Sequence, residues 1–362
     1  MDMNKTTVLD DIIQYPRDAT IFAAACCIIF IVIGFLGNFI TILALCRCTM
    51  LRNATTAFVI SLCTSDFLFC TINLPLTASR YIHQAWLLGD TACSLFPFFF
   101  YGNVGASLMS MTLITVNRFV IFNYHHLYGK IYKKRFVVLM IIFCWVFSFA
   151  LLVPTLTRAW GEFGLDKATF SCTILMRNGR SPKKFLFVVG FLIPCVVIVL
   201  SHASIIWKVR NSRRNVVAHT QVNLRTPDPL AKQTTQRKDE SRLNRMIIII
   251  FCSFILCFLP LMIVNVFDSK FRFPTIHVVA SVLAWMSSCI NPFIYVGLNR
   301  HYRQAYYRLL CSKPRNQRTS IVSCFNRSTS EGEFKTVVSE VFVFSDQNNT
   351  TNPEREKEEN VV

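Results

Sequence analysis

Residues 60–76 read ISLCTSDFLFCTINLPL, and this stretch decides the fold because it places one carboxylate, Asp66, in the middle of a long apolar run. A charged side chain at bilayer depth costs about 2.5–3.5 kcal/mol on insertion scales, so it normally faces a protein interior or a water-filled pocket. The other long apolar runs contain almost no acidic residues. Asp66 therefore predicts a membrane helix bundle with one polar centre, not a chain of proton-carrying groups.

The composition supports a membrane protein. Hydrophobic residues make up 53% of the chain and charged residues only 16%, whereas roughly a quarter of the residues of a soluble domain are charged. A transmembrane helix needs about 20 apolar residues. Runs of that length lie at 21–46, 55–81, 91–122, 136–157, 184–208, 244–268 and 275–298. Because the connections are short, consecutive helices should be antiparallel neighbours. The predicted fold is all-α, a bundle of seven transmembrane helices.

Four segments follow from this pattern. We expect an extracellular N-terminus at 1–20 without a signal peptide, the bundle at 21–298, an amphipathic cytoplasmic helix at 299–312 and a disordered cytoplasmic tail at 313–362. The tail is polar and ends in PEREKEENVV. Cys311, at the end of the amphipathic helix, is a candidate for palmitoylation.

Basic residues set the expected orientation. They gather at 130–135, 208–245 and 300–318, all on one side of the predicted bundle, and that side should be cytoplasmic. The loop before the fifth run is also basic, which weakens the rule. The protein is then a multi-pass plasma-membrane protein with its N-terminus outside, where Asn4 lies in a glycosylation sequon. The net charge of +18 mostly reflects this asymmetry, so a nucleic-acid partner is not expected.

Two of the 15 cysteines differ from the others, most of which lie within apolar runs as small packing residues. Cys93 opens the third run and Cys172 lies in the loop before the fifth, both at the oxidising outer face. A bridge between them would hold that loop over the mouth of the bundle. The alternative is two free thiols that share a face.

The third run carries polar residues at helical spacing. Phe100, Asn103, Ser107 and Ser110 step by three or four residues and therefore lie on one stripe. We expect this stripe to face Asp66. The predicted polar centre contains Asp66, Asn103, Ser107, Ser288 and Asn291. Two interpretations stay open: these oxygens share a sodium ion, or they form a neutral hydrogen-bonded core.

The cytoplasmic end offers a candidate latch. Arg118 ends the third run and Glu240 precedes the sixth, so the two side chains would pair if these helices close. The alternative is an arginine that only extends its charged end into water. Pro260 kinks the sixth helix beside Phe258, either as a hinge or for packing alone.

The motifs together resemble those of the rhodopsin-like G-protein-coupled receptors. The resemblance covers about residues 20–312, and it includes Trp86 before Gly89 in the first outer loop. The matching residues are Gly37-Asn38, Asp66, Cys93, Asn117-Arg118-Phe119, Trp145, Pro194, Cys257-Phe258-Leu259-Pro260 and Asn291-Pro292-x-x-Tyr295. Within this family the chain is similar to the insect group of trapped in endoderm and moody receptors, and more distantly to the medium-chain fatty-acid receptor. The resemblance implies a receptor for an extracellular ligand that activates a heterotrimeric G protein, with arrestin as a further candidate partner. It also implies roles in cell migration, polarity or epithelial barrier formation.

The resemblance further implies functional positions. Asn117, Arg118 and Phe119 with Glu240 would couple to the G protein, and the activation switch would contain Phe258, Pro260, Pro292 and Tyr295. The ligand pocket would be lined by Arg80, Phe100, Val104, Leu261, Met262, Asn265, His277, Ser281 and Trp285. Because the third helix lacks the acid typical of amine receptors, an amphiphile with a carboxylate or phosphate head fits best. A small peptide or a sugar remains open.

Three departures from the family pattern matter. Asn117 replaces the usual Asp before the arginine, so Arg118 should be less restrained and basal activity raised. Phe258 replaces the usual tryptophan, which puts a tryptophan-like switch in doubt. His202 replaces a usual tyrosine; we expect a satisfied interior histidine, the alternative being a hydrogen-bonding role in the open state.

Other function classes fit poorly. A retinal-type pump needs a Schiff-base lysine in the last helix, and residues 275–298 contain none. A proton transporter needs several acids at depth. No metal cluster or nucleophile constellation suggests an enzyme, and no cofactor is expected beyond the sodium ion. An adhesion or scaffold role remains the competing hypothesis.

Overall fold

The computed structural model describes residues 15–48, 53–167, 169–220, 228–267 and 272–311. Within these ranges, the side chains at 212–220, 228–240, 266–267 and 311 lie outside the description. The predictions for Asn4, for the side chains of Glu240 and Cys311, and for the tail at 313–362 therefore fall outside the described residues.

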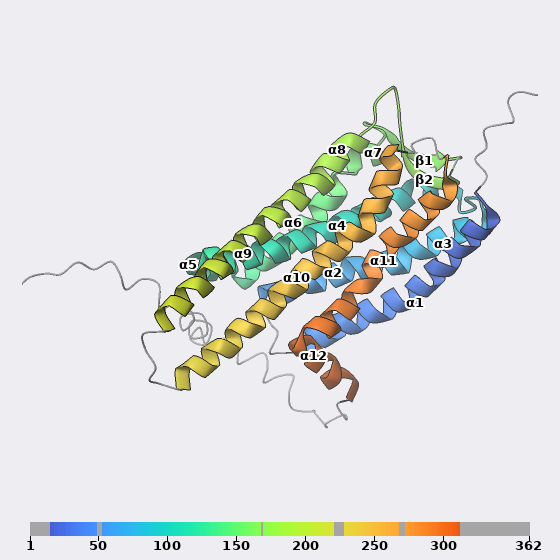
Figure 1. Cartoon of the computed structure of the whole chain (residues 1–362). Coiled ribbons are helices and arrows are strands. Elements are labelled where there is room, and N and C mark those ends of the chain that lie inside the picture. Colours follow the sequence, from blue (N-terminus) through green and yellow to red (C-terminus); the bar gives the residue numbers. More distant parts are fainter. Residues whose placement is uncertain (1–14, 49–52, 168, 221–227, 268–271, 312–362) are drawn as a thin grey trace, which may run out of the picture. The chain divides into compact units, whose positions relative to one another are not determined.

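Seven described helical stretches are long and apolar enough to cross a membrane. The first is α1 (Arg17–Arg47), the second joins α2 (Ala54–Leu68), η2 (Phe69–Asn73) and α3 (Leu74–His83), and the third is α4 (Gly89–Asn123). The fourth joins α6 (Lys134–Ala150) and α7 (Val153–Leu156), and the fifth joins α8 (Lys183–Phe187), η3 (Val188–Leu192) and α9 (Ile193–Thr220). The last two are α10 (Asp228–Phe267) and α11 (Pro274–Leu298) (Figure 1).

Three smaller elements complete the fold. The short helix α5 (His125–Ile131) follows α4, and α12 (Arg300–Cys311) follows α11. Strands β1 (Glu162–Asp166) and β2 (Ser171–Leu175) form an antiparallel hairpin in which Gly164 pairs with Thr173. The hairpin and α12 lie at opposite ends of the helices (Figure 1).

The predicted helix ends lie within four residues of the observed ones, except at the start of the sixth helix and the end of the fifth. The sixth helix starts at Asp228, whereas hydropathy placed its start at 244. The additional segment is rich in Lys, Gln, Arg and Glu, which favour helix but are invisible to a search for apolar runs. The fifth helix likewise continues to Thr220, beyond its predicted end at 208.

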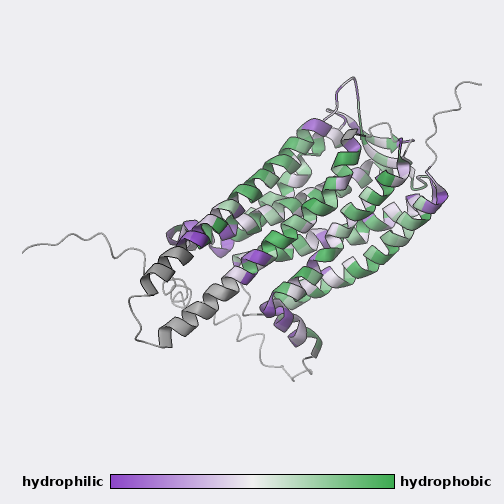
Figure 2. Ribbon diagram, viewed as in Figure 1, coloured by the Kyte–Doolittle hydropathy of each residue, from purple (hydrophilic) through white to green (hydrophobic). Residues whose placement is uncertain are grey.

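The surface pattern is that of a membrane bundle. Apolar residues cover the middle of the helices and polar residues their ends (Figure 2). Large apolar side chains such as Ile28, Leu139 and Leu256 are 52%, 57% and 69% exposed, as expected where lipid replaces water. The helix α4 packs against α2, α6 and α9. The main core lies between these helices and α10.

Two spans contain a wide π-turn just before a proline. The turn η2 precedes Pro75, and η3 precedes Pro194. A proline lacks the N–H that bonds to the residue four positions earlier, and its ring clashes with that carbonyl. The wider turn relieves the clash and rotates the helix face on its outer side. Both turns therefore change which residues face the interior.

Candidate functional site

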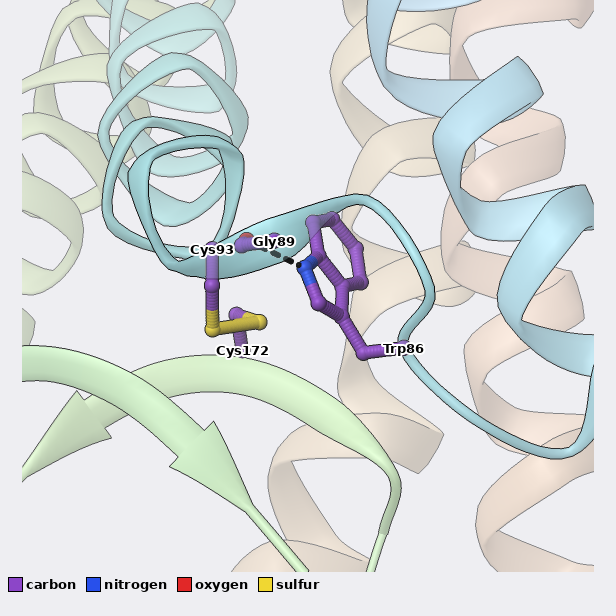
Figure 3. The surroundings of a disulfide bond; sticks show 4 residues. All are labelled: Trp86, Gly89, Cys93 and Cys172. Carbon is purple, nitrogen blue, oxygen red and sulfur yellow. Dashed lines mark hydrogen bonds between the residues drawn. A yellow bond between two sulfur atoms is a disulfide. The ribbon is translucent and has the colours of Figure 1, made fainter.

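A disulfide fixes the outer end of the bundle. Cys93 at the start of α4 is bonded to Cys172 in β2, across 79 residues of sequence. Beside the bridge, the indole N–H of Trp86 donates a hydrogen bond to the carbonyl of Gly89 at 3.0 Å (Figure 3). The indole ring also packs against Phe96, with ring centroids 5.4 Å apart. The bridge thus holds the hairpin against the first turns of α4, which confirms the predicted pairing.

A cavity of about 540 Å³ lies among the helices beside the hairpin. Its lining includes all nine predicted pocket residues: Arg80, Phe100, Val104, Leu261, Met262, Asn265, His277, Ser281 and Trp285. Phe258 and the hairpin residues Thr173 and Ile174 also line it. Cavities of about 300–1,000 Å³ suit small organic ligands, so this space is the candidate ligand site.

Aromatic residues absent from the sequence prediction contact one another beside the cavity. Tyr15 meets Phe170 edge to face at 5.0 Å, Phe170 meets Tyr81 at 5.9 Å, and Tyr81 meets Trp285 at 5.8 Å. Burial raises the pKa of Tyr15 well above its ordinary value, so its hydroxyl stays protonated. Tyr15 and Phe170 lie outside the periodic helices, so no spacing pattern could have indicated them.

Arg80 is the cation of this cavity that is best placed to meet an anion. Its guanidinium lies 4.3 Å from the centroid of the Tyr81 ring, and Nη1 donates to the carbonyl of Thr169 at 3.3 Å. Nε is buried and has no hydrogen-bond partner among the described residues. A guanidinium with an unused donor beside a cavity is well suited to a carboxylate or a phosphate.

The polar centre lies at Asp66, which is 1% exposed. Asn291 donates to one carboxylate oxygen at 2.7 Å and Ser107 to the other at 3.3 Å. Ser288 hydrogen-bonds with the same carboxylate. Oδ1 of Asn103 is buried and has no described partner. The structure thus brings four of the five predicted residues together by hydrogen bonds and places the fifth in the interior with a free acceptor.

Ser110, on the same stripe, has other partners. Its hydroxyl meets Ser61 at 2.9 Å and Cys144 at 3.7 Å. The indole N–H of Trp145 donates to Ser61 at 3.0 Å, so this group joins α2, α4 and α6. On the other side of the bundle, Asn38 donates to the carbonyl of Ser288 at 2.9 Å and joins α1 to α11.

Whether the polar centre holds a sodium ion or is a neutral hydrogen-bonded core remains a prediction. In the described part of the chain, the carboxylate contacts hydroxyl and amide groups and no basic side chain. Carboxylate, hydroxyl and amide oxygens are suitable ligands for hard cations. A buried carboxylate without a counter-charge is costly, and a bound sodium ion would supply that charge.

At the cytoplasmic end, Asn117 is bound by residues that sequence reasoning missed. The hydroxyl of Thr55 in α2 donates to its side-chain oxygen at 2.7 Å, and the phenol of Tyr132 lies near the same side chain. Its neighbour Arg118 is 3% exposed. Because the Glu240 side chain is not described, the latch remains a prediction.

Two tyrosines of α12 fasten it to the bundle. Tyr302 stacks on Tyr295 of α11 with ring centroids 5.5 Å apart, and the hydroxyl of Tyr306 hydrogen-bonds with Thr41 of α1. Tyr295 itself is fully buried. The spacing of Tyr302 and Tyr306, four residues apart on a helix, is the signal that could have identified this pair.

The expectation for His202 is only half correct. The residue is 6% exposed and therefore interior, but neither ring nitrogen has a hydrogen-bond partner in the described part of the chain. Its ring lies 6.5 Å from that of Phe251, which offers no acceptor atom. The prediction of a satisfied histidine is wrong because α9 faces an apolar stretch of α10 at this depth.

Phe258 occupies the predicted switch position. It is 7% exposed and packs against Phe254, with ring centroids 4.4 Å apart. Because Phe258 also lines the cavity and Pro260 lies two residues further on, a ligand would touch α10 beside its proline. Both roles remain predictions.

The seven-helix bundle, the bridged outer loop and the buried carboxylate define a class of membrane receptor. The sequence family described as 7 transmembrane receptor (rhodopsin family) matches residues 37–295. The chain therefore belongs to this family of G-protein-coupled receptors, which are multi-pass plasma-membrane proteins, are not enzymes and act through heterotrimeric G proteins.

Particular relatives refine this assignment. Protein trapped in endoderm-1 of Drosophila melanogaster is 46% identical over 308 residues, which cover 82% of this chain and 79% of that protein. G-protein coupled receptor moody of the same fly is 35% identical over 358 residues, covering 83% of this chain but 53% of the longer relative. The crystal structure of squid rhodopsin has a TM-score of 0.73 at 22% identity and covers 91% of this chain and 93% of that one. This last match concerns the fold alone.

Proposed function

We propose that this receptor binds a small anionic amphiphile in the cavity beside the hairpin and activates a G protein in response. One observation carries the proposal: Arg80, with an unused buried donor, lies in the wall of a cavity that is otherwise mostly apolar and aromatic. A charged head would pair with the guanidinium, and the remainder of the ligand would be buried against apolar side chains.

The charges of the cavity support an anionic head. Arg80 and Lys183 line it, and Asp166 is the acid in its lining. Asp166 accepts a hydrogen bond from Thr169 at 3.2 Å, so part of its charge is already engaged. The part of α4 that lines the cavity contributes Phe100 and Val104 but no carboxylate, which disfavours an amine ligand.

We further propose how binding reaches the cytoplasmic side. The N-terminus is outside, so the ligand approaches the hairpin end. The resting state is held by a sodium ion at Asp66 and by an Arg118–Glu240 pair. Ligand contact with Phe258 moves α10 about Pro260, the pair opens, and Pro292 and Tyr295 adjust the end of α11. Phosphorylation of the tail would then permit arrestin binding.

The relatives also support a proposal for the biological role. Resemblance to the trapped in endoderm and moody receptors supports a role in cell migration, polarity or the formation of an epithelial barrier. The ligand would then be a local signal in developing tissue. Loss of the gene product should disturb cell positioning or barrier tightness before it affects growth.

The test is nucleotide exchange on purified G protein by the receptor in nanodiscs. Carboxylate and phosphate amphiphiles should stimulate exchange, and Arg80→Gln should raise the effective concentration about 10- to 100-fold, since hydrogen bonds to charged groups contribute about 1.5–3 kcal/mol. The matched control is Arg177→Gln, because Arg177 is an exposed arginine of the outer loop. Equal effects of both substitutions would contradict the proposal, and no exchange with any G protein would favour an adhesion or scaffold role.

A further inference from the structure

Beyond the nine predicted residues, the cavity lining includes further residues of three helical stretches, and we call the part of the cavity that they line the slot. Its walls are Gly105 and Met109 of α4, Phe147 and Ser148 of α6, and Gly190 and Phe191 of η3. This slot is part of the same cavity that Arg80 lines. A ligand bound at Arg80 can therefore extend within one cavity toward these residues of α4, α6 and η3.

The slot follows from the local chemistry of η3. Pro194 cannot donate to the carbonyl of Gly190, four residues earlier, and the wide turn Val188–Leu192 absorbs the resulting clash. At Gly190 itself, an added Cβ would meet no heavy atom within 4 Å. The backbone there has no positive φ, so conformation does not require glycine. Instead, the missing side chain leaves open space beside the cavity.

The opposite wall of the slot is smooth and apolar. Gly105 lets α6 approach α4 closely, since a Cβ there would lie 3.3 Å from that of Ser148. The hydroxyl of Ser148 is already used, because it donates to the carbonyl of Cys144 at 2.8 Å. Phe147, Phe191 and Met109 supply carbon and sulfur surface. None of the six residues that line the slot offers an unused side-chain polar group, and such a lining suits an unbranched hydrocarbon chain better than a peptide or a sugar.

We propose that this slot binds the hydrocarbon tail of a single-chain anionic lipid whose head is held at Arg80. The inference rests on the proposed ligand function of the cavity and adds the shape of the ligand. Gly190 and Met109 then determine which chain length fits. Fatty carboxylates and lysophosphatidates share the required chemistry, namely one anionic head and one chain.

The experiment measures binding, not signalling, so that failure of the slot is distinguishable from failure of G-protein coupling. Saturated fatty carboxylates of increasing length are titrated onto the receptor in nanodiscs, and a parallel series uses lysophosphatidates. For the wild type, affinity should rise about fourfold per methylene while the slot fills, as expected for burial of a methylene group. It should then stop rising. The series that binds more tightly at equal chain length identifies the source of the head group.

Substitutions in the slot should move this limit. Gly190→Leu fills the open space and should shorten the best chain by several methylenes. Met109→Ala widens the slot and should lengthen it, which preserves the test if Gly190→Leu fails to fold. Gly297→Leu is the matched control, because Gly297 also has open surroundings but lies far along α11 from the cavity lining. It should leave the best length unchanged.

The outcomes separate the two proposals. An unchanged best length in Gly190→Leu and Met109→Ala, with weaker binding of every chain to Arg80→Gln, overturns the slot and retains the head site. Binding with the expected shifts but without nucleotide exchange supports the slot and contradicts the proposed signalling. If neither series binds, both proposals are overturned.

Discussion

The outer and inner ends of the bundle are built in opposite ways. At the outer end a covalent bridge between Cys93 and Cys172 holds the hairpin in place, and the space among the helices is left open as a cavity. At the inner end the described residues form no disulfide, and the interior is filled by a large apolar core that includes Phe251 and Phe254.

This difference suggests a division of labour. A fixed rim with an open interior can accept a small molecule without a large rearrangement of its own. A filled interior held by packing and single hydrogen bonds can open, because each contact contributes little. Ligand binding at the outer end can therefore be followed by movement of the helices at the inner end.

The largest test of the comparison is to break the outer bridge. Cys172→Ser should destabilise the receptor by about 2–5 kcal/mol, lower its surface expression and weaken ligand binding. Flow cytometry and thermal denaturation of the purified receptor measure these effects. Cys252→Ser, at an exposed free cysteine of α10, is the control. Wild-type expression of the Cys172 variant would show that packing alone fixes the hairpin.

The second test concerns the centre between the two ends. If sodium binds Asp66 only in the resting state, replacing sodium by a bulky organic cation at constant ionic strength should increase agonist affinity about 5- to 150-fold. Asp66→Asn should abolish this effect. Asp90→Asn, at the exposed start of α4, should not. A wild type that is insensitive to sodium would support the neutral hydrogen-bonded centre instead.

The third test removes the proposed latch at the inner end. A partly hydrated ion pair contributes about 1 kcal/mol at most, so Glu240→Ala should raise basal nucleotide exchange up to about fivefold. Arg118→Ala should abolish exchange, because the same arginine would contact the G protein. Glu162→Ala in the outer hairpin serves as the control. Equal loss of exchange in both cytoplasmic variants, at matched surface expression, would contradict a latch.

The smallest test sharpens the role of Asn117. Thr55→Val removes its hydrogen bond to Asn117 and should destabilise the resting receptor by about 0.5–1.5 kcal/mol. A double-mutant cycle with Asn117→Ala should show that the two losses are not additive. Thr112→Val is the control, since the Thr112 hydroxyl bonds only to a carbonyl of its own helix. Additive effects would mean that the contact does not contribute to stability.

The sequence could predict those parts of the molecule that repeat or that carry a rare residue. Long apolar runs indicated the helices. Asp66 indicated the polar centre because a charge at that depth is costly unless polar groups surround it. The nine cavity residues came from matching positions in the family. The disulfide of the hairpin could be predicted because Cys93 and Cys172 both lie at the predicted outer face.

The missed contacts depend on how helices meet. Nothing in the sequence distinguishes Thr55 and Tyr132 from other polar residues. Their contacts with Asn117 arise only because α2 and the end of α5 pack next to it. Tyr15 acts through a loop neighbour, Phe170, that no periodicity specifies. The slot at Gly190 depends on a π-turn whose only sequence signal was Pro194. The prediction that His202 is hydrogen-bonded was wrong because its surroundings are determined by the apolar face of α10.

The attachment of α12 has a mechanical consequence. Tyr302 stacks against Tyr295 of α11, and Tyr306 forms a hydrogen bond with Thr41 of α1. One short helix therefore connects the ends of two long ones. Burial raises the pKa of both phenols well above the ordinary value, so both hydroxyls stay protonated at the pH of the cell. If the end of α11 shifts relative to α1, α12 cannot keep both contacts unchanged. It must either rotate about the Tyr306 hydrogen bond or lose the stacking of Tyr302 on Tyr295.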